Sequence, residues 1–377
     1  MKRRMILALA GGIFSVVVCS LFLVGTAMGY DVTDKFSVGG VLAGAWQYLQ
    51  ADKDAAGENV DDGPKAAVAI QPEMSFRPYD NSELFAKFGF AANNGLNVKS
   101  PFVLTTWAAD LEDDVKDING RNRDYLLTGW AKHTFEFSES HSLGFSFGII
   151  DATDYVDENA FANDEYGQFL NEVFVNAVTG NFVSYDIGGV AQWAIGNFSA
   201  NGLIMDVGEN EEGNNFQYYA LQLAYLLETG LGEGNYRLTG TLTSDNFLNA
   251  DGDDDDETLS ALVFSADQQL GDIFGVFLRL GFQDDDAAVT YESEYSGGVN
   301  ISGSIWGREQ DNIGIGVAYL DDGNSALDNT LAAEAYVRFG LNEVFAISAD
   351  FQYLEDEYDV GDDVDGWVGS IRITAEF

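Results

Sequence analysis

The amino-acid sequence predicts an all-β fold, a transmembrane antiparallel β-barrel of sixteen strands. Three observations lead to this prediction. Apolar and polar residues alternate at period two through most of the chain, and the connections between these stretches are alternately brief and long. Acidic residues gather in the long connections, as they would if all of these connections lay at one end of a barrel.

The last twelve residues, 366–377, carry the alternation in its clearest form. One face of this stretch is apolar, with Trp367, Ile371, Ile373 and Phe377. The other face is polar or charged, with Ser370, Arg372, Thr374 and Glu376. Such a strand suits either a soluble sandwich or the closing position of a barrel in lipid. Because the rest of the chain favours the barrel, we expect this strand to seal against residues 35–49 and leave no exposed edge.

The amino-terminus has the composition of a secretory signal peptide. Residues 1–4 include three basic side chains, and an apolar run follows over 5–28 with small residues near its end. We predict a signal peptide over 1–29 and an outer-membrane barrel domain over 30–377, with an uncleaved anchor helix as the alternative. The single cysteine, Cys19, lies in the apolar run, so the mature chain is expected to lack disulfides and thiol chemistry.

Composition narrows the class of protein further. Acidic residues outnumber basic ones by 62 to 18, and the formal net charge is −44, so the chain repels nucleic acid and we exclude that partner. Aromatic residues make up 13% of the chain, which distinguishes it from a disordered acidic polypeptide. After the amino-terminal run no stretch approaches the roughly 20 apolar residues of a spanning helix, so an integral membrane form must be a barrel.

Sixteen stretches show the period-two alternation, and most are ten residues long or more. This length exceeds that of a usual soluble strand and suits a tilted crossing of a bilayer. The predicted strands are 35–49, 65–77, 82–92, 124–138, 141–151, 182–196, 198–207, 215–228, 234–244, 257–269, 272–283, 295–305, 311–320, 329–340, 343–354 and 364–377. Helical spacing occurs only near 105–117 and 163–171, where we expect short helical pieces.

The connections alternate in length. Those that follow even-numbered strands are brief turns, such as Gly196-Asn197, and Arg308 and Asp311 are expected to stabilise another of them. Those that follow odd-numbered strands are longer, namely 50–64, 93–123, 152–181, 208–214, 245–256, 284–294, 321–328 and 355–363. Short periplasmic turns and long extracellular loops are the plan of bacterial outer-membrane barrels, and an even strand number brings both termini to the periplasmic side.

Dense acidic runs fall in the long connections. They cover residues 110–117, 209–212, 251–257, 284–286, 321–322 and 355–365. We interpret them as solvated loops, and the alternative is that they bind divalent cations that bridge to lipopolysaccharide. Because Asp251-Gly252-Asp253 and its neighbours lack the spacing of an EF-hand loop, no metal site is predicted. No cofactor is predicted either.

The other face of the strands should line a polar, water-filled interior. The pore-lining candidates are Arg77, Lys87, Lys132, Arg279, Glu334, Tyr336, Arg338, Asp350 and Arg372. The same register points Glu73, Phe85 and Trp130 inward. Guanidinium and carboxylate groups can replace water around the hydroxyls of a sugar, and aromatic faces can meet its C–H faces. The alternative is that these charges pair across the wall and narrow the pore.

Three blocks of sequence resemble the carbohydrate-selective porin family. They comprise 151–155 with 157–165 and 168–171, then 295–299 with 307–319, and finally 334–339 with 350–353. Together they cover roughly Ile149 to Phe377, and the first block is the most specific. The first strand resembles the family loosely and is also similar to plug-less siderophore porins.

The resemblance implies a sixteen-stranded channel in the bacterial outer membrane that passes carbohydrates or other small hydrophilic solutes by passive diffusion. It also implies that 152–171 is a long loop that can fold toward the pore. Its family-motif residues are Asp157, Asn159, Asn163, Asp164, Gln168 and Asn171. The acidic loops favour cations or neutral solutes over anions, so a siderophore or cation-selective porin is the alternative.

Other classes of protein fit the sequence less well. An enzyme is not predicted, because the chain has only His133 and His141 and lacks a serine motif for them to serve. A soluble exported β-sheet binding protein is the alternative from another class. The expected partners are outer-membrane lipid, lipopolysaccharide, a small hydrophilic solute and, through Phe377, the barrel assembly machinery. A homotrimer is one oligomeric state open to the chain.

Overall fold

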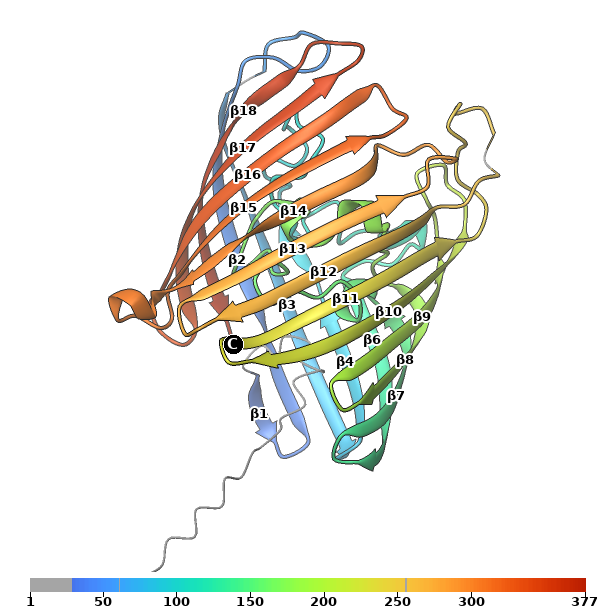
Figure 1. Ribbon diagram of the computed structural model, residues 1–377, viewed down its shortest axis with the longest axis vertical. Coiled ribbons are helices and arrows are strands. Elements are labelled where there is room, and N and C mark those ends of the chain that lie inside the picture. Colours follow the sequence, from blue (N-terminus) through green and yellow to red (C-terminus); the bar gives the residue numbers. More distant parts are fainter. Residues whose placement is uncertain (1–28, 61, 255) are drawn as a thin grey trace, which may run out of the picture.

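The computed structural model describes residues 29–377 apart from residues 61 and 255. Within this range sixteen antiparallel wall strands close into one barrel, as the sequence predicted (Figure 1). The strands are β2 (Phe36–Ala51), β3 (Gly63–Tyr79), β4 (Ser82–Phe88) with β5 (Phe90–Ala92), β6 (Leu126–Ser138), β7 (His141–Ile150), β8 (Asp186–Ile195), β9 (Phe198–Val207), β10 (Phe216–Thr229), β11 (Gly232–Thr243), β12 (Ser260–Leu270), β13 (Phe274–Gln283), β14 (Tyr291–Ser302), β15 (Asn312–Asp322), β16 (Leu327–Gly340), β17 (Phe345–Tyr358) and β18 (Val364–Glu376).

Two strands depart from the simple count. β4 and β5 form one wall position, because both pair with β3 and only Gly89 separates them. β1 (Tyr30–Thr33) is a short additional strand that pairs with the start of β2 at the end of the barrel where the chain terminates (Figure 1). The predicted signal peptide, 1–29, lies outside the described residues except for Gly29.

β18 closes the barrel against β2. Trp46 lies opposite Ile371 in this antiparallel pair, and the carboxy-terminal residue Phe377 exchanges two backbone hydrogen bonds with Gly40. This is the seam that the terminal stretch predicted. A closed seam leaves no unpaired edge in the wall, which satisfies the backbone groups that a bilayer cannot hydrate.

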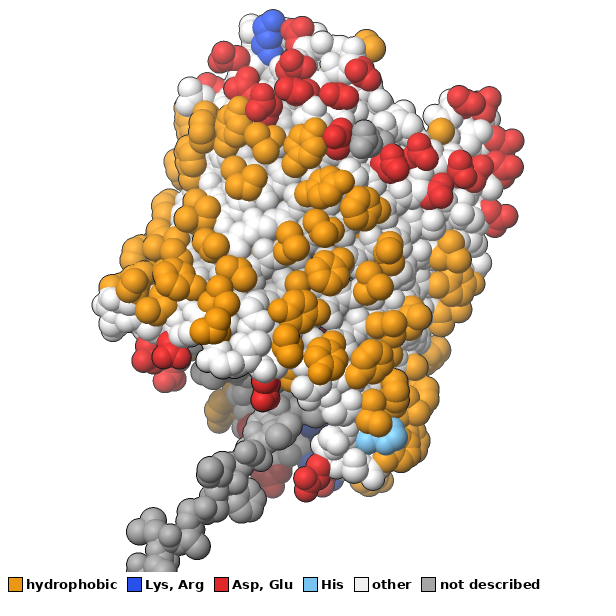
Figure 2. All heavy atoms as spheres, in the orientation of Figure 1, with side chains coloured by type: hydrophobic (Ala, Val, Ile, Leu, Met, Phe, Trp, Pro, Cys, Tyr) orange, Lys and Arg blue, Asp and Glu red, His pale blue; other side chains and the backbone are white. Residues whose placement is uncertain are grey.

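The outer face of the barrel is apolar over a wide band. On β18 the side chains of Trp367, Ile371 and Ile373 are exposed, whereas Arg372 between the last two is fully buried. Figure 2 shows hydrophobic side chains spread over the visible wall and acidic side chains gathered at the end that carries the long loops. This distribution fits a wall in lipid with a charged rim in water. Among the described residues no helix is long and apolar enough to span a bilayer.

Short turns and long loops lie at opposite ends of the barrel, with one departure from the prediction. The β14–β15 turn, residues 303–311, includes a 3-10 helix (Gly303–Trp306) and is longer than the β15–β16 loop, residues 323–326. Arg308 holds this turn with two hydrogen bonds to Asp311 of 2.6 and 3.0 Å, as expected. Arg308, Trp306 and the backbone N–H of Gly340 donate to the Asp311 carboxylate, and these bonds lower its pKa to about 2.

The short helices predicted near 105–117 and 163–171 are wrong. Within the described residues of these segments the backbone is irregular, and the nearest helical turns are 3-10 pieces at Ile118–Gly120 and Glu172–Phe174. The helical spacing of Trp107, Leu111 and Val115 is real, and all three side chains are fully buried. They are buried because the segment packs inside the barrel, where wall side chains bond its backbone in place of helical hydrogen bonds.

Candidate functional site

Two long connections fold into the barrel and narrow it. We call residues 93–125, between β5 and β6, loop A, and residues 151–185, between β7 and β8, loop B. Both contribute fully buried side chains to hydrophobic clusters shared with the inner face of the wall. Loop B thus folds into the pore, as the resemblance implied for 152–171, whereas loop A, which was expected to be solvated, also enters and fills part of the interior with apolar residues.

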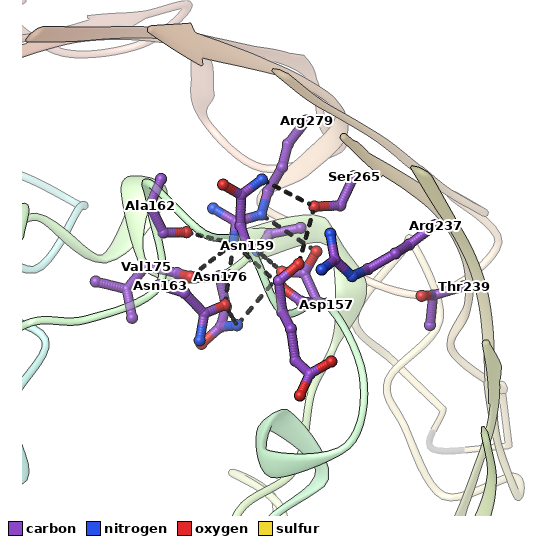
Figure 3. Close-up of polar contacts among 12 residues, drawn as sticks. Asp157, Asn159, Ala162, Asn163, Val175, Asn176, Arg237, Thr239, Ser265 and Arg279 are labelled. Carbon is purple, nitrogen blue, oxygen red and sulfur yellow. Dashed lines mark hydrogen bonds and ion pairs between the residues drawn. The ribbon is translucent and has the colours of Figure 1, made fainter. Parts of the chain in front are cut away.

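Arg279 on β13 is the principal anchor of loop B (Figure 3). Its guanidinium group is fully buried and pairs with Asp157 at 3.2 Å. It also donates to the backbone carbonyls of Phe174, Asp157, Ala162 and Val175 and to the side chain of Asn163. A planar group with five N–H donors is suited to gathering acceptors from several turns of one loop.

A second set of anchors lies on the last strands. Glu334 on β16 accepts hydrogen bonds from the backbone N–H groups of Leu170 and Asn171, the latter at 2.9 Å. Arg372 on β18 donates to the carbonyls of Glu165 and Gln168 at 2.7 and 2.6 Å. These wall side chains thus supply hydrogen bonds that an irregular loop cannot make within itself.

Aromatic rings fill the space between loop B and the wall. Phe169 and Phe174 of the loop pack against Phe277 on β13, and Phe169 meets Tyr336 on β16 edge-to-face at 5.0 Å between ring centroids. The Tyr336 hydroxyl receives hydrogen bonds from Asn300 on β14 and Asn312 on β15. This arrangement satisfies the polar end of a buried tyrosine.

Loop A is held by both the wall and loop B. Gln47 on β2 and Gln352 on β17 donate to the carbonyl of Thr106 at 3.2 and 2.9 Å. The indole N–H of Trp107 donates to the carbonyl of Glu165 in loop B at 3.0 Å. The two loops therefore form one packed unit, which lies mainly against β13–β18 and β2, while residues 152–156 of loop B also pack against β8–β10.

A channel of two adjoining cavities remains beside the loops. The central cavity has a volume of about 960 Å³ and the outer cavity, toward the long-loop end, about 680 Å³. Both are lined by Asp110, Val178, Asn181, Phe182, Ser184 and Tyr185, which define the neck between them. The Tyr185 hydroxyl donates to Asp110 at 2.7 Å and so fixes loop A to loop B at this neck.

The central cavity carries a large excess of negative charge. Among the described residues, eleven carboxylates and two cations, Lys87 and Arg237, line it. The carboxylates are Glu73, Asp110, Asp151, Asp154, Glu158, Asp164, Glu165, Glu172, Glu233, Glu343 and Glu376. Within the described part of the chain no group of three or more His, Cys, Asp or Glu side chains is arranged to hold a metal ion.

Burial raises the pKa of several carboxyl groups on the loops. It raises the pKa of Asp110 to about 6, of Glu158 to about 7 and of Glu165 to about 8. Neighbouring carboxylates add to the effect, and nearby cations such as Lys87 oppose it for Asp110. The negative charge of the cavity therefore depends on pH near neutrality.

The structure separates the predicted pore-lining residues into four sets. Arg279, Glu334, Tyr336, Asp350 and Arg372 face inward but are covered by loop B and line neither cavity. Arg77 and Arg338 lie near the short-turn end, where they pair with Glu83 and Glu376. Lys132 lies opposite Glu83 in the β4–β6 pair. Of the nine candidates, Lys87 lines the central cavity.

The family-motif residues mainly shape loop B. Asp157 accepts from Arg279 and the backbone N–H of Ala177, and Asp164 accepts from two backbone N–H groups of its own turn. Asn159, Gln168 and Asn171 bond to Ser265, Ala160 and Gln352 respectively, and Asn163 accepts from Arg279. Asn159, Asn163, Asp164 and Gln168 also reach the central cavity.

Sequence reasoning missed several residues of the cavity. Asp110 lies in a run expected to be a solvated loop, and Asp154 and Glu158 lie in the loop expected to fold toward the pore without being named among its site residues, although all three line the channel. Arg237, which faces inward from β11, was not singled out. The alternation along β11 was a usable signal for Arg237, whereas nothing local marks which acidic loop folds inward.

A closed sixteen-stranded wall with an apolar exterior, narrowed from within by loops, defines an outer-membrane porin. The sequence model of the family described as "Carbohydrate-selective porin, OprB family" matches residues 80–377. The chain belongs to this family. It is therefore a porin of the outer membrane, rather than an enzyme or a soluble binding protein.

Individual relatives are consistent with this assignment. An uncharacterized protein of Aquifex aeolicus is 28% identical over 251 residues, which cover 66% of this chain and 70% of that protein. The high-pH structure of Pseudomonas putida OprB has a TM-score of 0.70 at 13% identity and covers 91% of this chain and 94% of its own. The outer-membrane channel DcaP of Acinetobacter baumannii has a TM-score of 0.54 at 10% identity and covers 93% and 99%. At these identities the two structures establish the shared fold.

Proposed function

We propose that the channel carries small uncharged hydrophilic solutes, carbohydrates among them, by passive diffusion and that it favours cations over anions. The observation that supports this most is the lining of the central cavity, where eleven carboxylates face two cations among the described residues. A low-dielectric wall focuses that field along the channel, so anions meet a barrier and neutral solutes do not.

The arrangement of the cations strengthens the proposal. Arg237 is paired with Asp267 at 2.6 Å, so its charge is largely neutralised within the wall. Arg279 and Arg372, which the sequence placed in the pore, are sealed beneath loop B. The positive charges that would attract an anionic solute are therefore either paired or removed from the channel.

Two measurements on the purified barrel test this proposal. In planar bilayers under a potassium chloride gradient, we expect discrete conductance steps. The sign of the reversal potential should show that the channel is selective for potassium over chloride. In liposome swelling, neutral monosaccharides should enter faster than sugar acids of the same size. Absence of conductance, or selectivity for chloride, would refute it.

The partners of the barrel belong to the same proposal. Lipid is expected against the apolar wall, lipopolysaccharide around the acidic rim, and the assembly machinery at the Phe377 end. A homotrimer would show as a stable species of three times the monomer mass after chemical cross-linking in native membranes. Cross-linking that yields only monomer would refute the trimer and leave the channel proposal intact.

A further inference from the structure

Four amide side chains that line the central cavity share one orientation. Asn181, Asn201 and Asn235 donate their NH₂ groups to the side chain of Gln283, the carbonyl of Tyr155 and the carboxylate of Asp267, at 2.8, 2.7 and 2.9 Å. Gln71 likewise donates to Asp110. The Gln283 side chain donates its own NH₂ group to the carbonyl of Tyr291, so its oxygen faces Asn181, and the other partners are a backbone carbonyl and two carboxylates. These contacts therefore determine which amide atom is the nitrogen.

This orientation leaves acceptors facing the channel. The four amide oxygens receive no hydrogen bond within the described chain, and all four residues line the central cavity. Other lining amides differ: the side-chain oxygens of Asn159, Gln168 and Gln222 accept hydrogen bonds, and that of Asn163 accepts from Arg279. Gln71, Asn181, Asn201 and Asn235 thus present their amide oxygens to the channel.

A buried hydroxyl adds to the same surface. Ser199 on β9 is only 8% exposed, faces inward and lines the cavity, yet its hydroxyl has no hydrogen-bond partner within the described chain. Because this hydroxyl borders the cavity, a molecule in the channel can supply its hydrogen-bond partner. Ser199 and Asn201 therefore mark the β9 side of the cavity as a place for a polar ligand.

Three carboxylates in the cavity also lack partners. Glu73 on β3 and Asp154 and Glu158 on loop B make no side-chain hydrogen bond and no ion pair within the described residues. The Lys87 ammonium, the nearest counter-charge to Glu73 and Asp154, makes neither interaction with them, although it lies 5.8 Å from the ring centroid of Tyr185. The carboxylates are thus free to accept hydrogen bonds from a solute.

An apolar platform completes the lining. Phe85 on β4 lines the cavity and stacks on Trp130 of β6, with ring centroids 4.9 Å apart and planes 22° from parallel. A flat aromatic face can pack against the C–H face of a sugar ring while the surrounding oxygens accept from its hydroxyls.

We propose that the central cavity binds ammonium-bearing sugars, with the ammonium group held by Asp154 and Glu158 and the hydroxyls by the amide oxygens of Gln71, Asn201 and Asn235. This inference rests on the proposed porin function and names a solute class within it. An amino sugar offers N–H and O–H donors to a surface that offers acceptors, and its positive charge suits the free carboxylates. A neutral sugar satisfies the hydroxyl part alone, and a sugar acid is repelled.

The test uses the full-length barrel in planar bilayers with glucosamine, glucose and glucuronate as probes. Glucosamine at neutral pH should reduce the potassium current in a saturable manner, at concentrations at least tenfold below those at which glucose has any effect. The double variant Asp154→Asn/Glu158→Gln should raise the half-blocking concentration of glucosamine about tenfold or more, since it removes two charge-assisted acceptors. Glucuronate should not block.

Two further variants make the result specific. Asp285→Asn, in an exposed extracellular loop, removes the same kind of charge and should leave the half-blocking concentration unchanged. Lys87→Met removes the competing ammonium and should lower the half-blocking concentration.

Equal block by glucosamine and glucose, or equal effects of Asp285→Asn and the double variant, would overturn the inference. If the double variant fails to fold, a Lys87→Met variant with unchanged or weakened block would overturn it as well. A channel that conducts and passes neutral sugars without preferring glucosamine would refute this inference alone. Loss of all conductance in the unmodified protein would refute the proposed function.

Discussion

Arg279 and Lys87 show how differently two inward-facing basic residues can be used in one barrel. The sequence places both on the lumenal face of a wall strand. Arg279 is fully buried beneath loop B and donates to six acceptors on that loop. Lys87 lines the central cavity and makes no hydrogen bond within the described chain. Facing inward is therefore not the same as facing the channel.

The difference divides the barrel interior into two regions. On the side of β13–β18 and β2, charged side chains of the wall bind the two loops, and these interactions stabilise the fold. On the side of β3, β4 and β9–β11, fewer wall groups bind the loops, and the amide oxygens of Gln71 and Asn201 remain free to determine what the channel admits. Substitutions on the first side should thus change stability, whereas those on the second should change selectivity.

The largest effect is expected from Arg279→Met. Breaking this buried pair leaves the Asp157 carboxylate and several carbonyls without their donor, which should cost about 3–5 kcal/mol in the free energy of unfolding. Loop B should also leave the lumen part of the time, so single-channel conductance should rise. Denaturant unfolding and bilayer recordings measure the two effects.

The matched control is Arg77→Met, at the exposed pair with Glu83 near a periplasmic turn. Exposed pairs of this kind contribute about 1 kcal/mol or less. An equal loss of stability in the two variants would contradict the division of the interior into an anchoring and a channel region.

Glu334→Leu should have the next largest effect on stability. The substitution leaves the N–H groups of Leu170 and Asn171 buried without an acceptor, at an expected cost of about 2–3 kcal/mol. Because Glu334 is covered by loop B, the ratio of potassium to chloride permeability should change little as long as the loop stays in place. A large shift in that ratio at unchanged stability would place Glu334 in the channel region instead.

Cation preference should fall as the pH is lowered from 8 to 5. Burial raises the pKa of Glu158 to about 7 and of Glu165 to about 8, so both groups gain protons in this range and the cavity loses negative charge. The groups that act on Glu158 are Asp154 on its own loop, Lys132 on β6, Arg237 on β11 and Asp267 on β12. Reversal potentials recorded at several pH values measure the trend, and a cation preference that stayed constant would contradict it.

The smallest effect on stability is expected from Lys87→Met. Its ammonium makes no hydrogen bond within the described chain but is the counter-charge to Asp154 and Glu73, so the free energy of unfolding should fall by about 1–2 kcal/mol, less than for the other two buried sites. The ratio of potassium to chloride permeability should rise, because one of the two cations lining the cavity is removed. A destabilisation as large as that of Arg279→Met would show that Lys87 also anchors the loops.

The wall of the barrel was predictable because its pattern is local. Each of the sixteen predicted strands is present, and in β13 and β16 the alternation gave the correct face for Arg279 and for Glu334. The candidate site was predictable only in part. Lys87 was found from register, but Asp110, Asp154 and Glu158 lie on loops whose composition resembles that of the solvated loops outside.

The sequence contains residues that mark the inward position of the loops, although we interpreted them as lining a water-filled pore. Phe277 and Tyr336 are large aromatic residues on the lumenal face of their strands, where a purely aqueous pore has no use for them. In the structure they pack against Phe169 and Phe174 of loop B. The apolar spacing in loop A resembles that of a helix, but it has another cause. These side chains are buried because they contact the inner face of the barrel wall.

The sequence by itself determined the sixteen strands, the face that each presents to lipid, and the closure of residues 364–376 against β2. Those features depend on the period-two alternation within each strand and on the lengths of the connections between strands. Both are local properties of the sequence. The tertiary structure alone decided that loop A folds into the lumen beside loop B, that Arg279 and Arg372 are sealed, and that Asp154 and Glu158 remain free. Those outcomes depend on which distant donors and acceptors meet inside the barrel, because a buried charge is tolerated only where it finds a partner.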